Sequence, residues 1–250
     1  MAHFVHNLLS WGSDPTYGFA GQRPLAAGRR LLLLDRRGYG HSPDTVRSDF
    51  EADAEDVVEV LGERVGDGGG HLVGHGNGGV VALLAAARRP RLVRSLALVQ
   101  PSAFTAATDR PVVADLLDRV RGSAPGVPDG VTPERFLRDS TEGIGLAVPE
   151  PTPVRLRAAA TSMRERPIWE AEIPLPAVRA AAVPVLVICG TWEDAPAAYR
   201  EHVGRPLIAV AESLTDSLGA RLVRVPGYYP HTQRPAAVNA ALGGFWDSCG

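Results

Sequence analysis

The sequence contains no lysine. All 26 of its basic residues are arginines, and the formal net charge of the 250 residues is −2. A chain this close to neutrality has no general attraction to nucleic acid or to anionic lipid, so we expect neither as a partner. The arginines are scattered, which favours GC-rich codon usage over a set of guanidinium phosphate sites as their explanation.

Cysteine is scarce, and long apolar runs are missing. The two cysteines, at positions 189 and 249, give neither a disulfide framework nor metal-ligand spacing. No apolar run approaches the length of a membrane span, and the amino terminus lacks the pattern of a secretory signal. We therefore expect a cytoplasmic protein with no metal and no membrane association. The oligomeric state stays open.

Short β-rich apolar runs alternate with helical patterns along most of the chain. Runs that are apolar on both faces are typical of buried parallel strands, and the alternation predicts an α/β fold with a mostly parallel sheet flanked by helices. The predicted strands are 3–6, 30–34, 71–73, 95–99, 185–188 and 221–225. The predicted helices are 50–65 (capped by Asp49), 80–89, one or two within 197–218, and 235–246.

The middle of the chain differs from the rest. Residues 105–183 are rich in Arg, Pro and Ala and contain no convincing strand, although 109–121 and 133–141 have helical patterns and prolines interrupt the remainder. We expect this segment to form a helical lid over a pocket, inserted into a core of residues 1–104 and 184–250. A purely structural insertion is the alternative.

A glycine occupies the most informative position. The segment HLVGHGNGG (71–79) runs from a strand into a helix and has the shape of the nucleophile elbow G-x-S-x-G, with Gly76 at the centre. Glycine offers no atom that could attack a substrate. The elbow strains its central residue by about 1–3 kcal/mol, and glycine avoids that strain.

The same segment also fits the dinucleotide-binding pattern G-x-G-x-x-G. However, the next strand ends at Gln100 and Pro101 rather than at an acidic residue that could bind a ribose hydroxyl. We therefore interpret the match as accidental and expect no cofactor.

Four segments occur in a characteristic order: LLLLDRRGYGHSP (31–43), HLVGHGNGG (71–79), VPVLVICGTWED (183–194) and VPGYYPHTQRP (225–235). Together they resemble the α/β-hydrolase superfamily over nearly the whole chain. The resemblance implies an active site at the carboxyl ends of the strands, built from a nucleophile, a histidine, an acid and two backbone amides.

Several of these family positions are altered here. Gly76 stands at the nucleophile position and Tyr228 at the histidine position. His231 is a displaced alternative to the missing histidine, although an ordinary loop histidine is the preferred interpretation. Glu193 matches the acid, with Asp194 as its neighbouring alternative.

The resemblance also places an oxyanion hole and a pocket. The first amide of the oxyanion hole belongs to Asn77. The second comes from the loop near Asn7 or Leu8, where His6-Asn7 replaces the His-Gly pair that is common in the family. His75, Trp192 and Asp194 are further candidate pocket residues. Packing beneath the elbow is an equal alternative for His75, and packing in the core is the commoner role for a tryptophan such as Trp192.

Three functions remain open, and the first two are close in merit. In the first, the protein binds a small apolar or polyketide-like molecule under its lid without hydrolysing it. Alternatively, it is a cyclase, isomerase or lyase in which Tyr228 and Glu193 act as acid and base while the Asn77 amide holds an enolate-like oxygen. The third is an esterase-like or epoxide-hydrolase-like enzyme with an unrecognised nucleophile. Whether it is an enzyme is therefore undecided.

Overall fold

The computed structural model describes residues 1–66, 68–123 and 126–249. Its centre is a six-stranded sheet in the order β2-β1-β3-β4-β5-β6, with every neighbouring pair parallel. The α/β prediction is thereby confirmed. The strands are β1 (Ala2–Val5), β2 (Leu31–Leu34), β3 (Gly70–His75), β4 (Val93–Val99), β5 (Val185–Gly190) and β6 (Arg221–Val225).

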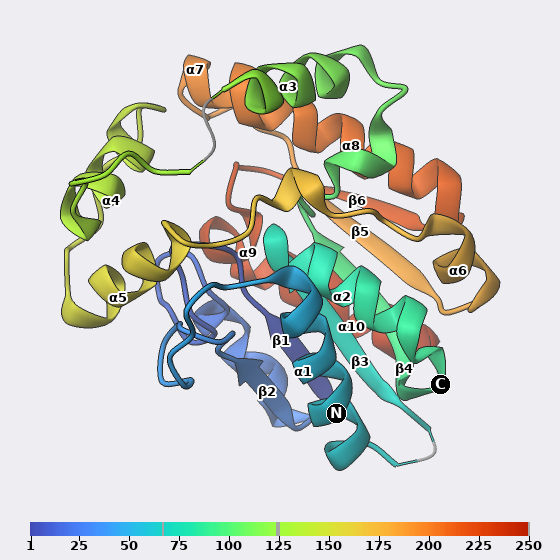
Figure 1. The fold of residues 1–250 in the computed structure, drawn as a ribbon. Helices are drawn as coiled ribbons and strands as arrows, with labels where there is room; N and C mark the ends of the chain where they lie inside the picture. The colour runs from blue at the N-terminus through green and yellow to red at the C-terminus, as the bar shows by residue number, and fades with distance from the viewer. Residues whose placement is uncertain (67, 124–125, 250) are drawn as a thin grey trace.

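Helices cover both faces of the sheet (Figure 1). Neighbouring residues of one strand serve opposite faces: Leu72 belongs to one apolar core and Val73 to the other. The first core is closed by α1 (Phe50–Arg64), α2 (Asn77–Arg88) and α8 (Arg205–Leu218), and the second by α10 (Pro235–Ser248) and the 3₁₀ segment η1 (Ala20–Ala27).

The helix boundaries follow from local chemistry. The Asp49 side chain caps α1 by accepting a hydrogen bond from the amide of Glu51, as the sequence predicted. Helix α2 begins at Asn77, three residues before the predicted start. The expected helical region 197–218 divides into α7 (Ala197–Tyr199), a π-helical turn η5 (Arg200–Gly204) and α8.

In the part of this segment that the structure describes, five helical pieces lie between β4 and α6 (Leu175–Ala180): η3 (Phe104–Ala107), α3 (Pro111–Gly122), α4 (Pro133–Glu142), α5 (Pro153–Ser162) and η4 (Ile168–Glu170). Residues 124 and 125 of the expected lid lie outside the described residues. The prediction that prolines interrupt this region was wrong for α5, because Pro153 occupies the first turn, where proline is tolerated, and Thr152 caps the helix.

Helices α3, α4 and α5 lie beyond the carboxyl ends of the strands (Figure 1). Arg155 of α5 makes a bidentate ion pair with Asp14, with both N–O distances 2.6 Å, and also donates to the carbonyl oxygen of Leu9. Both charged side chains are buried. Of the helices that the structure describes, none has the length and apolar character needed to cross a bilayer.

Candidate functional site

Gly76 terminates β3 in a backbone conformation that strongly favours glycine. Its φ is 55° and its ψ is −119°, a combination that strains any residue with a side chain. The amide of Gly76 donates to the carbonyl oxygen of Val99, and its own carbonyl accepts from the amides of Gly79 and Ser102. The sharp turn is therefore fixed by hydrogen bonds on both sides.

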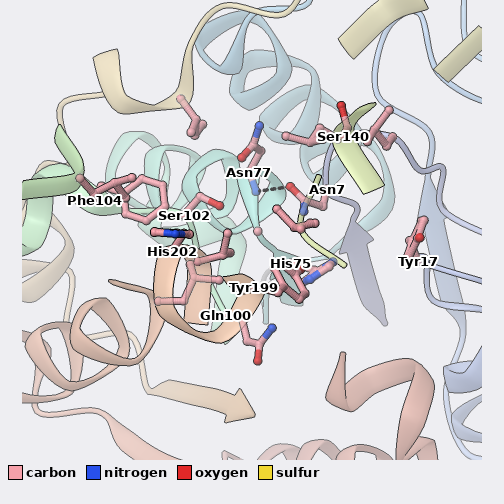
Figure 2. Close-up of a pocket in the computed structure, with 18 of the residues that line it drawn as sticks. Asn7, Tyr17, His75, Asn77, Gln100, Ser102, Phe104, Ser140, Tyr199 and His202 are labelled. Carbon is pink, nitrogen blue, oxygen red and sulfur yellow. Dashed lines mark hydrogen bonds between the residues drawn. The ribbon is translucent and has the colours of Figure 1, made fainter. Parts of the chain in front are cut away.

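The Asn7 side chain fills the space into which a side chain at position 76 would project. A Cβ atom at Gly76 would lie 2.3–2.6 Å from the Cγ, Oδ1 and Nδ2 atoms of Asn7. Oδ1 of Asn7 accepts a hydrogen bond from the amide of Asn77 at 2.9 Å (Figure 2). The amide expected to form the oxyanion hole therefore already has an acceptor within the protein.

The loop that carries Asn7 is held by His6. Nε2 of His6 accepts from the amide of Arg36 at 3.0 Å, so Nδ1 bears the proton and donates to the carbonyl oxygen of Asn7 at 2.6 Å. Burial, with a further contribution from Arg36, places the pKa of His6 well below its ordinary value. Leu8, the other expected source of an oxyanion amide, lines the cavity described next.

A cavity of about 310 Å³ lies at the elbow, lined by Gly76, Asn7, His75 and Asn77 among others. Its walls come from the strand ends and from the inserted helices, including Leu117 of α3, and are largely apolar. Among the described residues, no Asp, Glu or Arg lines it. The remaining polar side chains of its wall are Tyr17, Gln100, Ser102, Ser140, Thr141, Tyr199, His202 and Tyr229.

His75 and His231 form a buried pair with ring centroids 4.1 Å apart. His231 lies on the short helix α9 (Pro230–Gln233), behind His75, and its Nε2 donates to the carbonyl oxygen of Tyr17 at 3.2 Å. Burial lowers the pKa of His231 to about 4. Burial also places the pKa of His75 well below its usual value, and the neighbouring His231 contributes to that shift. Both rings are thus neutral near pH 7. His231 thus lies in a short buried helix rather than in a loop, which corrects its predicted location, whereas the interpretation that it is not the catalytic histidine stays a prediction.

The structure does not bring the other expected residues to the cavity. Tyr228 is half-buried and packs against Trp192 and Tyr199. Trp192 is fully buried in that cluster, and the side chains of Glu193 and Asp194 are exposed to solvent. None of Tyr228, Trp192, Glu193 and Asp194 lines the cavity.

Gln100 is a cavity residue to which the sequence interpretation gave no role. It lies just after β4 with φ of 44°. Its Oε1 accepts from the amide of Gly190 at 2.8 Å, and its Nε2 donates to the carbonyl oxygen of Tyr228 at 2.9 Å. One side chain thus ties together the carboxyl ends of β4 and β5 and the loop after β6. Its place directly after a strand was the only available signal.

A buried charge cluster lies beside Asn77. Nδ2 of Asn77 donates to Oε1 of Glu165 at 3.0 Å, and the same carboxylate accepts from Arg36 and from the hydroxyl of Tyr39. Burial raises the pKa of Glu165, but Arg36 and these hydrogen bonds outweigh it and hold the pKa below its ordinary value. Arg36 also pairs with Asp53, whose pKa burial raises to about 6.

Glu165 connects the inserted helical segment to the elbow. It follows α5, whereas Arg36, Tyr39 and Asn77 belong to the core. Each of its two oxygens accepts two hydrogen bonds, so no lone pair is left to act as a base. Glu165 therefore has a positioning role. It borders a second cavity of about 870 Å³, which shares five lining residues with the first: Leu8, Asn77, Val120, Ile168 and Trp169.

Comparison with known proteins identifies the family. The family model described as "alpha/beta hydrolase fold" matches residues 4–191. The chain belongs to this family, which includes esterases, lipases and other hydrolases.

Curated relatives resemble parts of the chain. An sn-1-specific diacylglycerol lipase, ABHD11 of Mus musculus, is 34% identical over 100 residues, which are 40% of this chain and 32% of that protein. The polyketide synthase ThaQ of Burkholderia thailandensis is 28% identical over 235 residues, which are 85% of this chain and 10% of that protein. The chain spans about a third of the length of the first curated relatives that it matches.

Solved structures share the fold. NosK from Streptomyces actuosus has a TM-score of 0.64 and 24% identity, with 99% of this chain and 97% of that chain covered. A thermophilic esterase from Thermogutta terrifontis also has a TM-score of 0.64, with 21% identity and coverage of 99% and 89%.

Proposed function

We propose that this protein binds a neutral, largely apolar small organic molecule at the elbow, beneath a helical lid formed by residues 105–183, and does not hydrolyse it by Ser-His-acid chemistry. The observation that supports this most strongly is the replacement at the elbow. Gly76 supplies no nucleophile, and the side chain of Asn7 occupies the space and the amide that a reacting carbonyl would need.

The character of the cavity supports the same proposal. Its lining among the described residues is mostly aliphatic and aromatic, with no carboxylate or guanidinium, and its buried imidazole is neutral. A charged ligand would lose its hydration there without gaining a partner of opposite charge. The likeness of 85% of this chain to part of a polyketide synthase favours a polyketide-like ligand.

The acid-base alternative has less support. It assigned the proton transfers to Tyr228 and Glu193, and neither lines the cavity. The hydroxyls that do line it include those of Tyr199 and Tyr229, where Tyr199 donates to Tyr229 at 2.9 Å. Burial raises the pKa of both, which makes them poor proton donors at neutral pH.

The hydrolase alternative keeps one specific observation in its favour. Ser102 and His202 both line the cavity (Figure 2), and the amide of Ser102 donates to the carbonyl oxygen of Gly76. A displaced nucleophile would therefore be sought at Ser102.

The proposal is tested with the neutral fluorophore N-phenyl-1-naphthylamine, whose emission rises in apolar surroundings. We expect saturable binding that Leu146→Trp, which fills the cavity, weakens by at least about tenfold. Val148→Trp is the matched control, because Val148 lies two residues away, is exposed and does not line the cavity.

Activity is measured on the same protein. We expect no labelling by a fluorophosphonate and no hydrolysis of p-nitrophenyl esters above the buffer rate. Covalent labelling at Ser102, lost in Ser102→Ala, would establish the hydrolase alternative instead. A fluorophore that fails to bind, or that binds Leu146→Trp equally well, would refute the proposed site.

A further inference from the structure

We infer that the carboxamide of Asn7 is the group that anchors the ligand, donating a hydrogen bond from Nδ2 to a neutral acceptor oxygen such as that of a ketone, lactone or amide. This inference rests on the proposed function. In this interpretation a ligand carbonyl at the elbow is bound by a hydrogen bond from Asn7, whereas a nucleophile at position 76 would have attacked it.

The hydrogen bond to Asn77 fixes which way the Asn7 amide faces. A backbone N–H requires an acceptor, so the atom 2.9 Å from the Asn77 nitrogen is Oδ1. Nδ2 is then the atom left for other contacts. Within the described parts of the chain Nδ2 has no hydrogen-bond partner, and Asn7 lines the cavity. When a ligand supplies a partner to a buried or half-buried amide that lacks one, the new hydrogen bond stabilises the complex.

The position of Asn7 strengthens Nδ2 as a donor. Its oxygen lies at the amino terminus of α2, a helix of 12 residues, where the partial positive charge of the helix dipole favours electron density on an acceptor. Polarisation of the carbonyl makes the N–H groups of the same amide better donors. The helix terminus therefore acts on the ligand through Asn7 rather than directly.

The same arrangement selects against anions. In an unblocked elbow the Asn77 amide would stabilise an oxyanion. Here Oδ1 of Asn7 already occupies it, and no arginine among the described residues lines the cavity. The ligand class that fits is an apolar body bearing one neutral oxygen acceptor.

Nuclear magnetic resonance can test this directly, because the chain contains only three asparagines, at positions 7, 77 and 239. Protein labelled with 15N-asparagine gives three side-chain NH₂ pairs and three backbone amide signals. The probe is 4-phenyl-2-butanone, and n-butylbenzene is the matched hydrocarbon without the oxygen.

We expect the ketone to shift the Asn7 NH₂ pair downfield in a saturable way, whereas n-butylbenzene does not. Asn239 is the internal control, since its Nδ2 already donates to the carbonyl oxygen of Gly21. The Asn77 backbone amide should stay hydrogen-bonded to Asn7. A ketone that instead frees this amide from Asn7 and binds it directly would overturn the inference.

Asn7→Asp supplies the second measurement. It preserves an acceptor for the Asn77 amide and removes the donor, so the fold is maintained. We expect the affinity for the ketone, measured by displacement of N-phenyl-1-naphthylamine, to fall by about tenfold relative to that for n-butylbenzene. Equal losses for both probes would overturn the anchor.

The outcomes separate the two proposals. If the fluorophore binds but the ketone neither binds nor moves the Asn7 signal, the anchor is refuted and the proposed site stands. If neither the fluorophore nor either probe binds, both proposals are refuted.

Discussion

Introducing a serine at the elbow should destabilise this protein, and part of the cost should vanish when Asn7 is changed as well. Gly76→Ser places a Cβ atom where the Asn7 carboxamide now lies, in a backbone conformation that only glycine adopts without strain. Asn7→Gly removes the obstructing side chain but leaves the strain. The two substitutions should therefore be strongly coupled.

The magnitudes follow from the geometry. The conformation at position 76 costs a residue with a side chain about 1–3 kcal/mol. Contacts of 2.3–2.6 Å force a displacement of Asn7, for which overpacking in proteins suggests a further cost of about 1–3 kcal/mol. Asn7→Gly alone should cost about 1–3 kcal/mol because the Asn77 amide loses its acceptor. In the double variant the overlap vanishes, which gives a coupling free energy of about 1–3 kcal/mol.

Urea unfolding of the parent, the two single variants and the double variant measures this coupling, with the slope m checked for each protein. Additivity within about 0.5 kcal/mol would show that the two side chains do not compete for one space. The double variant should still lack esterase activity, because no described imidazole lies with an acid in the cavity. Fast ester hydrolysis by it would contradict the proposed loss of the catalytic histidine.

Two further predictions concern stability. The pKa of His231 is about 4 in the folded state against 6.5 when unfolded. The stability that neutral, buried His231 contributes to the folded state is therefore fully present above pH 6.5 and is lost as the pH falls toward 4. Between pH 7 and pH 5 the His231→Gln variant should therefore lose about 2 kcal/mol less stability than the parent. Urea unfolding at the two pH values measures this difference, with His41→Gln, at an exposed histidine, as the control. An unchanged dependence of stability on pH would contradict the prediction. Arg155→Met leaves Asp14 buried without its cation and should cost about 3–5 kcal/mol, whereas Arg135→Met, in an exposed pair, should cost under about 1 kcal/mol; equal costs would refute the importance of burial.

Much of the fold was predictable because its signals are local. The predicted strand 221–225 matches β6, and the other strands are displaced by at most about two residues at either end, as is usual for such boundaries. Helix α2 was predicted to start too late because Gly78 and Gly79 weaken the local helical signal. Both glycines are needed for packing: a Cβ at Gly78 would lie 2.2 Å from the carbonyl oxygen of Val5.

The site was predictable only where it depends on backbone pattern. The motif identified Gly76 as the centre of the elbow, since a strand-to-helix turn is a local feature. The roles of Glu165 and Gln100 depend on contacts between distant segments: Glu165 meets Asn77 from a position 88 residues away. Such contacts leave no periodicity or spacing in the sequence.

Asn7 shows most clearly what a motif comparison omits. Aligned as one half of an oxyanion hole, it was considered for its backbone amide, where asparagine in place of glycine looks like a defect. In three dimensions its side chain fills the space into which a side chain at position 76 would project, and it satisfies the Asn77 amide, 70 residues away. A buried amide without an acceptor costs about 1–3 kcal/mol, so a protein that loses its nucleophile and binds no oxyanion benefits from a permanent occupant. Under the proposed function, Gly76 and Asn7 therefore act as a pair: the glycine leaves the space at the elbow free, and the Asn7 side chain fills it and satisfies the Asn77 amide.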